Sequence, residues 1–557
     1  MRLERNVRTA MADGIELVSD IFLPDGEKPF PVILIRTPYD RLKARIRRKG
    51  WYFSSHGFAV VIQDVRGTGE SPGHDTFVPW YADGEDGRDT LLWLERQSFC
   101  NGKIGTHGGS YLATNQWLTA PLAPESLKCM VAYVGPYSFR SGYYHGGAHY
   151  LMITLPYALM MDGVIDFAAG GPDALEQMHK RLWTLPLVDA DLAGGGHNTM
   201  FHDMITKSFS DPYWNRMDGF RDASAIHVPT LQMEGWFDAY SMQAFRARDI
   251  LKGGAGTDDA RNQARILVGA WGHDRSGESF GDMNFGANVN TDLYQYELTW
   301  FQHWLMGIDT PIVHQPPVRV FTMGLNTWRD FSEWPPSDAH ESSWYLHSLG
   351  GANSLSGDGR LSRELPGDES ADRFEYDPLD PVPSVGGNHS VDFAGIPAGP
   401  FDQREIEARR DVLVYTSEVL ECAVEMSGPV ALDLWAVSSA PDTDFTAKVV
   451  DVFPGGDAFN LCEGIIRAGF RNGGDHSEPI EPGKPYCYRI QLFDTSHCFL
   501  PGHRIRVDVS SSNFPRFSRN LNTGANSHTT AETAIASQTI LHDDTHPSAL
   551  LVFERDC

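Results

Sequence analysis

The stretch Ile104-Gly-Thr-His-Gly-Gly-Ser-Tyr-Leu-Ala113 decides how the chain is interpreted, because it predicts a strand that turns sharply into a helix at Ser110. Gly108 and Gly109 permit a strained turn that lifts the serine hydroxyl clear of a sheet, and the following helix directs N–H groups at developing negative charge. The generic pattern Gly-x-Ser-x-Gly has glycine where this chain has Leu112, and Gly-Gly-Ser is also an ordinary turn or helix N-cap. The stretch alone leaves both a nucleophilic serine and a structural turn open.

Apolar runs on the N-terminal side of this turn predict a parallel sheet. Pro31–Ile35 and Ala59–Gln63 are continuous apolar runs, which is typical of strands buried on both faces. A helix predicted over Gly87–Arg96 precedes Lys103–Thr106, the strand that leads into the serine. Alternating strands and helices indicate an α/β domain.

Beyond residue 137 the pattern changes to helices and then returns to strands. A capping box at Pro172–Glu176 starts a helix. Strands are predicted again at Thr230–Met233 and Arg265–Gly269, followed by a helix over Thr291–Met306. We therefore predict a discontinuous α/β-hydrolase domain, residues 1–137 and 227–335, with a helical cap inserted at 138–226.

Residues 336–557 predict an all-β domain. Short alternating runs such as Asp411–Tyr415, Ala431–Trp435 and Arg504–Val509 are separated by turns rich in Gly, Pro and Asp. This is typical of a β-sandwich, and a jelly roll is the form we expect. Sugar binding and packing beside an active site are both open roles for it.

The charge balance excludes several partners. With 46 basic and 73 acidic residues, the net charge of −27 repels nucleic acid and anionic lipid surfaces. The first residues contain no apolar stretch of signal-peptide length, and the longest apolar run, Tyr150–Met161, is short and contains Pro156. We expect a cytoplasmic protein with no nucleic-acid or membrane partner.

No metal or cofactor is expected. The seven cysteines are scattered without a Cys-x-x-Cys pair. His145 and His149 have the spacing of two ligands on one helical face, but Gly146 and Gly147 between them weaken the helix and no His-Glu-x-x-His motif is present.

Two polar residues that follow later strands complete a catalytic constellation. A serine hydroxyl needs a base, and the base needs an acid to orient it. Asp238 follows the strand at Thr230–Met233, and His273 follows the strand at Arg265–Gly269. Asp238 alone could be a helix N-cap and His273 a loop residue, but the order Ser110, Asp238, His273 is that of an α/β-hydrolase triad.

The oxyanion formed by attack of the serine needs hydrogen-bond donors. One is the backbone N–H of Tyr111, the residue after the nucleophile. The second is the hydroxyl of Tyr39, on a loop that Pro38 stiffens. The alternative for Tyr39 is a tyrosine packed in a loop.

Aromatic residues near these positions predict a substrate pocket, since they supply apolar surface for an acyl or leaving group. The predicted pocket residues are Tyr143, Tyr144, His145, Tyr150, Trp236 and Phe237.

Together these motifs resemble those of the cocaine esterase-like hydrolases, which are related to the X-prolyl dipeptidyl aminopeptidases and the α-amino-acid ester hydrolases. The likeness runs nearly from end to end. Its motifs are Arg36-Thr-Pro-Tyr39, Asp64-Val-Arg-Gly-Thr-Gly-Glu-Ser71, Asn101-Gly-Lys-Ile-Gly105, Gly109-Ser-Tyr111, Gly235-Trp-Phe-Asp238, Trp271-Gly-His273, and Trp328-Arg-Asp330 followed by Trp334-Pro335. The resemblance implies the same three-part architecture and the same roles for the triad and for Tyr39 and Tyr111.

Two departures from the family pattern bear on packing and substrate. Ala113 stands where the family usually has glycine, and we expect close packing of the helix to survive this small change. The α-amino-acid ester hydrolases carry two carboxylates after the triad aspartate that hold a substrate ammonium, and the matching residues here are Tyr240 and Ser241. We therefore expect no requirement for a free α-amino group, unless Asp162 or Asp166 of the cap replaces those carboxylates.

The predicted function is hydrolysis of carboxylic esters of small to medium acyl groups through an acyl-enzyme. The partner is a small-molecule ester or amide, and homo-oligomer formation stays open. One alternative is an amidase or X-Pro-type dipeptidyl aminopeptidase of the same fold. An alternative from another class is a non-catalytic carbohydrate-binding protein.

Overall fold

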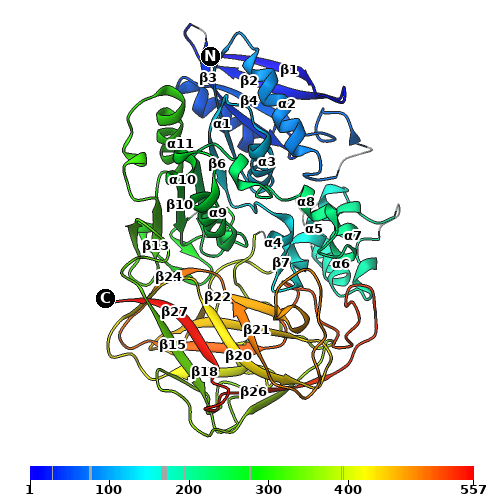
Figure 1. Cartoon of the computed structure of the whole chain (residues 1–557), viewed down its shortest axis with the longest axis vertical. Helices are drawn as coiled ribbons and strands as arrows, with labels where there is room; N and C mark the ends of the chain where they lie inside the picture. Colours follow the sequence, from blue (N-terminus) through cyan, green and yellow to red (C-terminus); the bar gives the residue numbers. More distant parts are fainter. Residues whose placement is uncertain are drawn as a thin grey trace.

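A computed structural model of the chain contains a mixed α/β part with a helical insertion and a mostly antiparallel β domain, as predicted (Figure 1). It describes residues 1–27, 29–74, 78–164, 172–192, 196–274, 277–390, 392 and 394–556. In Figure 1 the α/β part lies above and the β domain below, with the insertion beside their junction. The candidate active site lies where these three parts meet.

Ten of the described strands form the sheet of the α/β part. The central pairings from β4 to β13 are parallel, whereas β1, β2 and β14 pair antiparallel at the two edges. Across the sheet the strands are β1 (Arg2–Ala10), β2 (Glu16–Leu23), β4 (Ala59–Asp64), β3 (Phe30–Thr37), β5 (Cys100–Gly109), β6 (Leu127–Tyr133), β9 (Thr230–Gly235), β10 (Ala264–Gly269), β13 (Val318–Thr322) and β14 (Thr327–Phe331).

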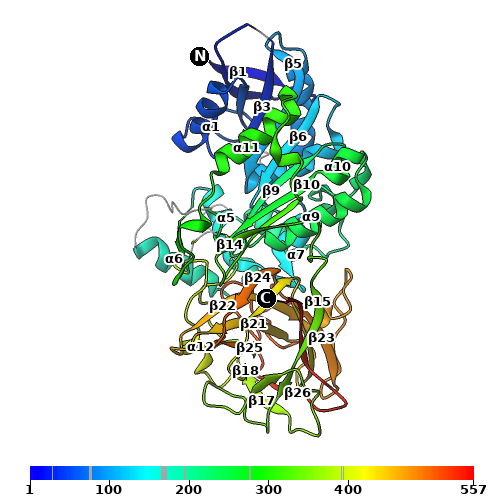
Figure 2. The same ribbon diagram turned by 90° about the vertical axis from the view of Figure 1, so that its left-hand side faces the viewer.

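The continuous apolar strands are buried on both faces, because helices cover each side of the sheet (Figure 2). In β3, Ile33 and Ile35 join one apolar cluster, whereas Val32 and Leu34 point to the opposite face and join another. The first cluster includes residues of α1 (Ala44–Ser55) and α11 (Leu293–Phe301), and the second includes residues of α2 (Asp83–Glu95), α3 (Tyr111–Thr119) and α9 (Ser241–Gly254).

The predicted helix over Thr291–Met306 differs in its last part. Regular α-helix ends at Phe301, and Gln302–Met306 forms a wider π-helical turn that ends at Gly307 with φ 73°. The shorter α10 (Asp258–Asn262) and the hairpin of β11 (Ser279–Phe280) and β12 (Met283–Asn284) lie in the loops around β10.

The insertion between β6 and β9 is helical, with one short hairpin. In the described part of the chain, no helix combines the length and the apolar character needed to cross a membrane. The elements of the insertion are α4 (Phe139–Tyr143), β7 (Tyr144–His145), β8 (Ala148–His149), α5 (Leu151–Met161), α6 (Pro172–Leu182), α7 (Thr199–Thr206) and α8 (Pro212–Arg216).

The β domain pairs its strands antiparallel except for β16 with β18. The elements of the β domain are β15 (His340–His347), β16 (Arg360–Ser362), β17 (Asp372–Tyr376), α12 (Arg404–Glu407), β18 (Leu413–Ser417), β19 (Val424–Gly428), β20 (Ala431–Ser438), β21 (Asp444–Val452), β22 (Ala458–Arg467), β23 (Tyr486–Gln491), β24 (Thr495–Phe499), β25 (Arg504–Ser510), β26 (Ala536–Leu541) and β27 (Ala549–Arg555). The boundaries between the three parts, at residues 137, 226 and 335, stay predictions.

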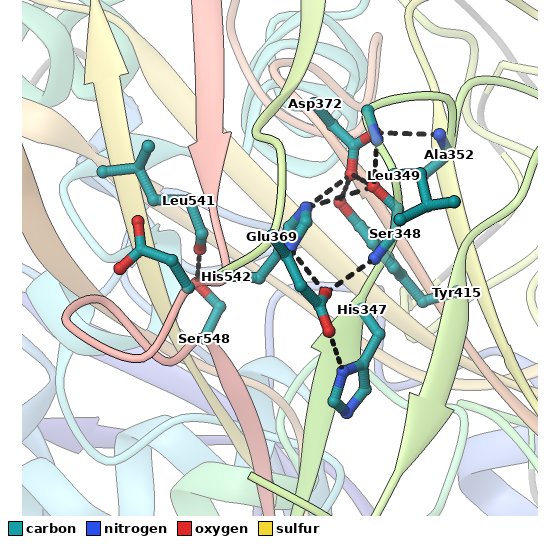
Figure 3. Close-up of polar contacts among 12 residues, drawn as sticks. His347, Ser348, Leu349, Ala352, Glu369, Asp372, Tyr415, Leu541, His542 and Ser548 are labelled. Atoms are coloured by element: carbon teal, nitrogen blue, oxygen red, sulfur yellow. Dashed lines mark hydrogen bonds and ion pairs between the residues drawn. The ribbon is translucent and has the colours of Figure 1, made fainter. Parts of the chain in front are cut away.

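A buried polar network lies inside the β domain (Figure 3). Oδ2 of Asp372 accepts hydrogen bonds from the hydroxyls of Ser348 (2.7 Å) and Tyr415 (2.8 Å) and lies 2.9 Å from Nε2 of His542. Nδ1 of His542 lies 3.3 Å from Oε2 of Glu369. Burial alone would lower the pKa of His542, but the hydrogen bond and charge of Asp372, with Glu369, raise it. The network thus favours the charged form of a buried histidine.

Candidate active site

Ser110 occupies a strained turn between β5 and α3. Its backbone has φ 60° and ψ −125°, which is costly for a residue with a side chain. A Cβ added to Gly108 would lie 2.3 Å from Cβ of Leu112, and one added to Gly109 would lie 2.0 Å from the Tyr133 ring. The two glycines are therefore required for the close approach of strand, turn and helix.

The packing of Ala113 explains how the chain accommodates alanine at this position. Ala113 is buried, and the neighbouring backbone belongs to Gly135, which follows β6. A Cβ on Gly135 would come within 2.8 Å of Cβ of Ala113 and 2.6 Å of the Ser110 carbonyl oxygen. Glycine on the facing loop leaves the space that the alanine methyl group fills.

Asp238 and His273 meet at the carboxyl edge of the sheet. They follow β9 and β10, which are parallel neighbours, so their loops leave the sheet at the same edge. Oδ2 of Asp238 lies 2.6 Å from Nδ1 of His273, and its Oδ1 accepts the N–H of Tyr240 at 2.9 Å. Asp238 is fully buried, so the carboxylate fixes the imidazole ring and leaves Nε2 for another partner.

Ser110 and His273 line one cavity of 510 Å³. Its walls come from the α/β part, the insertion and the β domain, the last through Ser390. Three wall residues other than glycine have positive φ: Trp80 (65°), Ser110 (60°) and Val134 (43°). Backbone strain of this kind concentrates at functional sites, where the surrounding structure enforces it.

Tyr39 lies on the cavity wall beside Ser110. It follows β3, and its N–H donates to the Thr37 hydroxyl at 3.0 Å. Burial raises the pKa of Tyr39, while hydrogen bonding with Tyr157 and Ser110 and the charge of Arg45 act in the opposite direction. The phenol is therefore neutral at pH 7 and able to donate a hydrogen bond near the serine.

The side chain of Tyr111 is anchored beneath the turn. Its hydroxyl donates to Oδ2 of Asp83 at 2.6 Å and accepts the N–H of Trp80 at 3.0 Å. Asp83 in turn lies 3.0 Å from Nη2 of the buried Arg36. The Arg36 motif thus supports the first residue of α3, whose own N–H has no partner within the helix.

The predicted pocket residues separate into two groups, because only Tyr143 lines the cavity that holds Ser110. The Tyr144 hydroxyl donates to the Met204 carbonyl group, and His145 Nε2 lies 2.6 Å from the Gln491 carbonyl oxygen. The Tyr150 hydroxyl accepts a hydrogen bond from Arg516 at 3.1 Å.

Trp236 and Phe237 are buried beneath the loop that carries Asp238. Nε1 of Trp236 donates a hydrogen bond to the Phe321 carbonyl group at 2.7 Å. The carbonyl oxygen of Trp236 accepts a hydrogen bond from Nδ2 of Asn388. The Phe237 ring stacks on Phe280 with centroids 5.8 Å apart. These residues position the loop instead of lining the cavity, and Asn388 ties it to the β domain.

Sequence reasoning missed most of the cavity wall. Ile153, Tyr157 and Met160 of α5 all line it, and their spacing of four and three residues places them on one helical face. That spacing was a readable signal, although α5 is apolar all round. Trp80 gave no periodic signal, because it lies in a loop.

The described residues contain no group of three or more His, Cys, Asp or Glu side chains arranged to hold a metal ion. Asp162, one proposed counter-charge, is exposed at the end of α5, and Asp166 lies outside the described residues.

Comparison with known proteins agrees with this architecture. The profile of the X-Pro dipeptidyl-peptidase (S15) family matches residues 13–275, and that of the X-Pro dipeptidyl-peptidase C-terminal non-catalytic domain matches residues 312–551. Cocaine esterase of Rhodococcus sp. (strain MB1 Bresler) is 37% identical over 540 residues, which cover 93% of this chain and 92% of that protein.

Two solved structures share the fold over 100% of this chain and 96% of theirs. One is an aminopeptidase from the marine sediment archaeon Thaumarchaeota archaeon, with TM-score 0.82 and 24% identity. The other is an α-amino acid ester hydrolase, with TM-score 0.78 and 23% identity. Identity and coverage with the Rhodococcus protein show the family, and the chain therefore belongs to the cocaine esterase-like serine hydrolases of the S15 family.

Proposed function

We propose that this serine hydrolase cleaves carboxylic esters of small to medium acyl groups through an acyl-enzyme on Ser110. The observation that carries the proposal is the strained serine facing the same cavity as a histidine fixed by a buried carboxylate. The cavity of 510 Å³ lies within the range of small-molecule sites.

The proposed reaction has two steps. Oγ of Ser110 attacks the carbonyl carbon as Nε2 of His273 removes its proton, and the imidazolium, held by Asp238, then protonates the departing alcohol. Water deprotonated by His273 attacks the acyl-enzyme, and the serine leaves with its proton restored.

The tetrahedral intermediate carries a negative oxygen that we assign to two donors, the N–H of Tyr111 and the hydroxyl of Tyr39. Because burial raises the pKa of Tyr39, its proton remains available at neutral pH. Donors of this kind stabilise the transition state more than the ground state when they are positioned in advance.

Aminopeptidase activity is the second candidate, since the matching family profile is described as X-Pro dipeptidyl-peptidase. Recognition of an α-ammonium group requires a nearby carboxylate. Tyr240 and Ser241 are both buried and carry none, and Asp274 is the one carboxylate among the described residues of the cavity wall. This balance favours esters that lack an α-amino group.

A labelling experiment tests the proposal. A fluorophosphonate probe is expected to modify Ser110 in folded protein, and aryl esters are expected to turn over faster than X-Pro anilides. Absence of labelling in folded protein would exclude Ser110 as the nucleophile. Faster turnover of the anilides would favour the aminopeptidase.

A further inference from the structure

The cavity wall is basic, although the chain as a whole is acidic. Lys43, Arg45 and Lys49 line it together with one carboxylate, Asp274. In the whole chain, 46 basic residues face 73 acidic ones. Basic residues thus outnumber acidic ones on the cavity wall, whereas acidic residues outnumber basic ones in the whole chain.

One of these charges is neutralised within the protein. Nζ of Lys49 forms an ion pair with Oε2 of Glu297, and His107 Nε2 lies 3.2 Å from the same oxygen. Both Lys49 and Glu297 are largely buried, so their charges compensate each other. The excess positive charge thus comes from Lys43 and Arg45.

Lys43 and Arg45 make no ion pair with any described residue. Asp40 is the acidic residue nearest to them in the sequence, and its Oδ1 accepts a hydrogen bond from the N–H of Leu42 at 2.9 Å. The first turn of α1 contains no acidic residue, and its helix dipole adds to the positive potential.

Arg45 also lies beside the proposed oxyanion donors. Its guanidinium carbon is 5.3 Å from the centroid of the Tyr39 ring, and its charge acts on the Tyr39 hydroxyl. A substrate whose carbonyl group lies between Ser110 and Tyr39 therefore has a substituent within reach of Arg45. An anionic substituent is the chemistry that such a surface stabilises.

We propose that the preferred ester substrates carry a carboxylate, which Arg45 and Lys43 bind at the N-terminal end of α1. This inference rests on the proposed ester hydrolysis and names its substrate class. The carboxylate belongs to either the acyl or the alcohol part of the ester, and the assay below distinguishes the two.

Matched pairs of esters test the charge alone. Monomethyl glutarate is compared with methyl glutaramate for the acyl part, and 3-(butyryloxy)benzoate with 3-(butyryloxy)benzamide for the alcohol part. At low ionic strength, the carboxylate ester of one pair is expected to have a kcat/KM about fivefold higher than its amide counterpart. The preference should shrink as the ionic strength rises from about 0.01 M to about 1 M, since the screening length falls from about 30 Å to about 3 Å.

The double variant Lys43→Gln/Arg45→Gln is expected to bring this ratio close to one. Arg48→Gln is the matched control, because Arg48 is exposed on the same helix and does not line the cavity, and it should keep the ratio. Because the two esters of a pair undergo the same reaction, the ratio of their kcat/KM values cancels any effect of the double variant on that reaction.

Fluorophosphonate labelling of the same samples separates the two levels of the argument. A labelled Ser110 with no carboxylate preference, or with a preference unchanged in the double variant, overturns the inference and leaves ester hydrolysis standing. An unlabelled Ser110 without turnover of any of the four esters overturns both.

Discussion

One group of Ser, His and Asp side chains lies at the cavity, and another lies inside the β domain. At the cavity, Asp238 binds Nδ1 of His273, and His273 lines the same cavity as Ser110. In the β domain, both nitrogens of His542 face carboxylates, and the Ser348 hydroxyl donates directly to Asp372 (Figure 3).

The difference teaches that residue types do not define a hydrolytic site. Ser110 has φ 60° and faces a cavity, whereas Ser348 lies beside β15 without a positive φ and is buried. A nucleophile needs a base with one free nitrogen and room for a substrate. In the β-domain group, Ser348 and Nε2 of His542 contact each other and Asp372, so these groups are occupied by protein partners and suit the network to holding strands together.

Replacing each of the two serines by alanine should give the largest difference in effect between the two sites. Ser110→Ala is expected to lower kcat for an aryl ester by on the order of a million-fold, since it removes the attacking atom. Ser348→Ala should leave kcat unchanged and lower the midpoint of thermal unfolding. Turnover of Ser110→Ala near that of the parent protein would contradict the assignment of the nucleophile.

Replacement of the two tyrosines should give a smaller contrast. Tyr39→Phe is expected to cost about 2 to 4 kcal/mol of transition-state stabilisation, because one oxyanion donor is lost. Tyr144→Phe is the control, since its hydroxyl bonds the Met204 carbonyl group away from the cavity. The measurement is kcat/KM for one ester. Equal values for the two variants would show that the Tyr39 hydroxyl is not an oxyanion donor.

Loss of the β-domain carboxylate should affect stability and not chemistry. Asp372→Asn is expected to lower the free energy of unfolding by about 3 kcal/mol, because it removes the main partner of the buried His542. Urea denaturation gives this value, and kcat is measured on the folded variant. A stability change below about 0.5 kcal/mol would show that the network contributes little.

The pH dependence of stability should give the smallest contrast. The pKa of His542 is raised, so its contribution is complete below about pH 6.5 and is lost as pH rises through the raised value. Hydrogen bonds from His542, Ala352, Ser348 and Tyr415 outweigh burial and lower the pKa of Asp372, so its contribution is lost only as pH falls below about 4.

His542→Gln tests this window. The difference in unfolding free energy between the parent protein and His542→Gln should be larger at about pH 5.5 than at about pH 9. A constant difference would assign the effect to packing rather than charge.

The backbone features of the fold were predictable from the sequence, whereas the cavity wall was not. Apolar runs located β3, β4, β9 and β10. Tyr39, Asp238 and His273 were located from the loops that follow β3, β9 and β10 at one sheet edge. The roles of these residues remain predictions. These strands could be predicted because a strand buried on both faces needs a continuous run of apolar residues in its own sequence.

The wall depends on which side chain points inward after the insertion folds. Tyr143 and Tyr144 are neighbours, yet one lines the cavity and the other faces α7. His145 and Tyr150 are held by the β domain, far away in sequence. Such contacts are tertiary, and aromatic composition alone does not reveal them.

The helical insertion separates the strands of one sheet in the sequence, and this has a consequence for synthesis on the ribosome. Strand β6 is complete at Tyr133, but its neighbour β9 begins only at Thr230, after the whole insertion has been made. The nascent chain therefore carries Ser110 while four of the ten strands, β9, β10, β13 and β14, and the residues Asp238 and His273 are still untranslated. A truncated product ending in the insertion would expose the edge of β6 that pairs with β9 in the complete chain, and an open strand edge can pair with other chains.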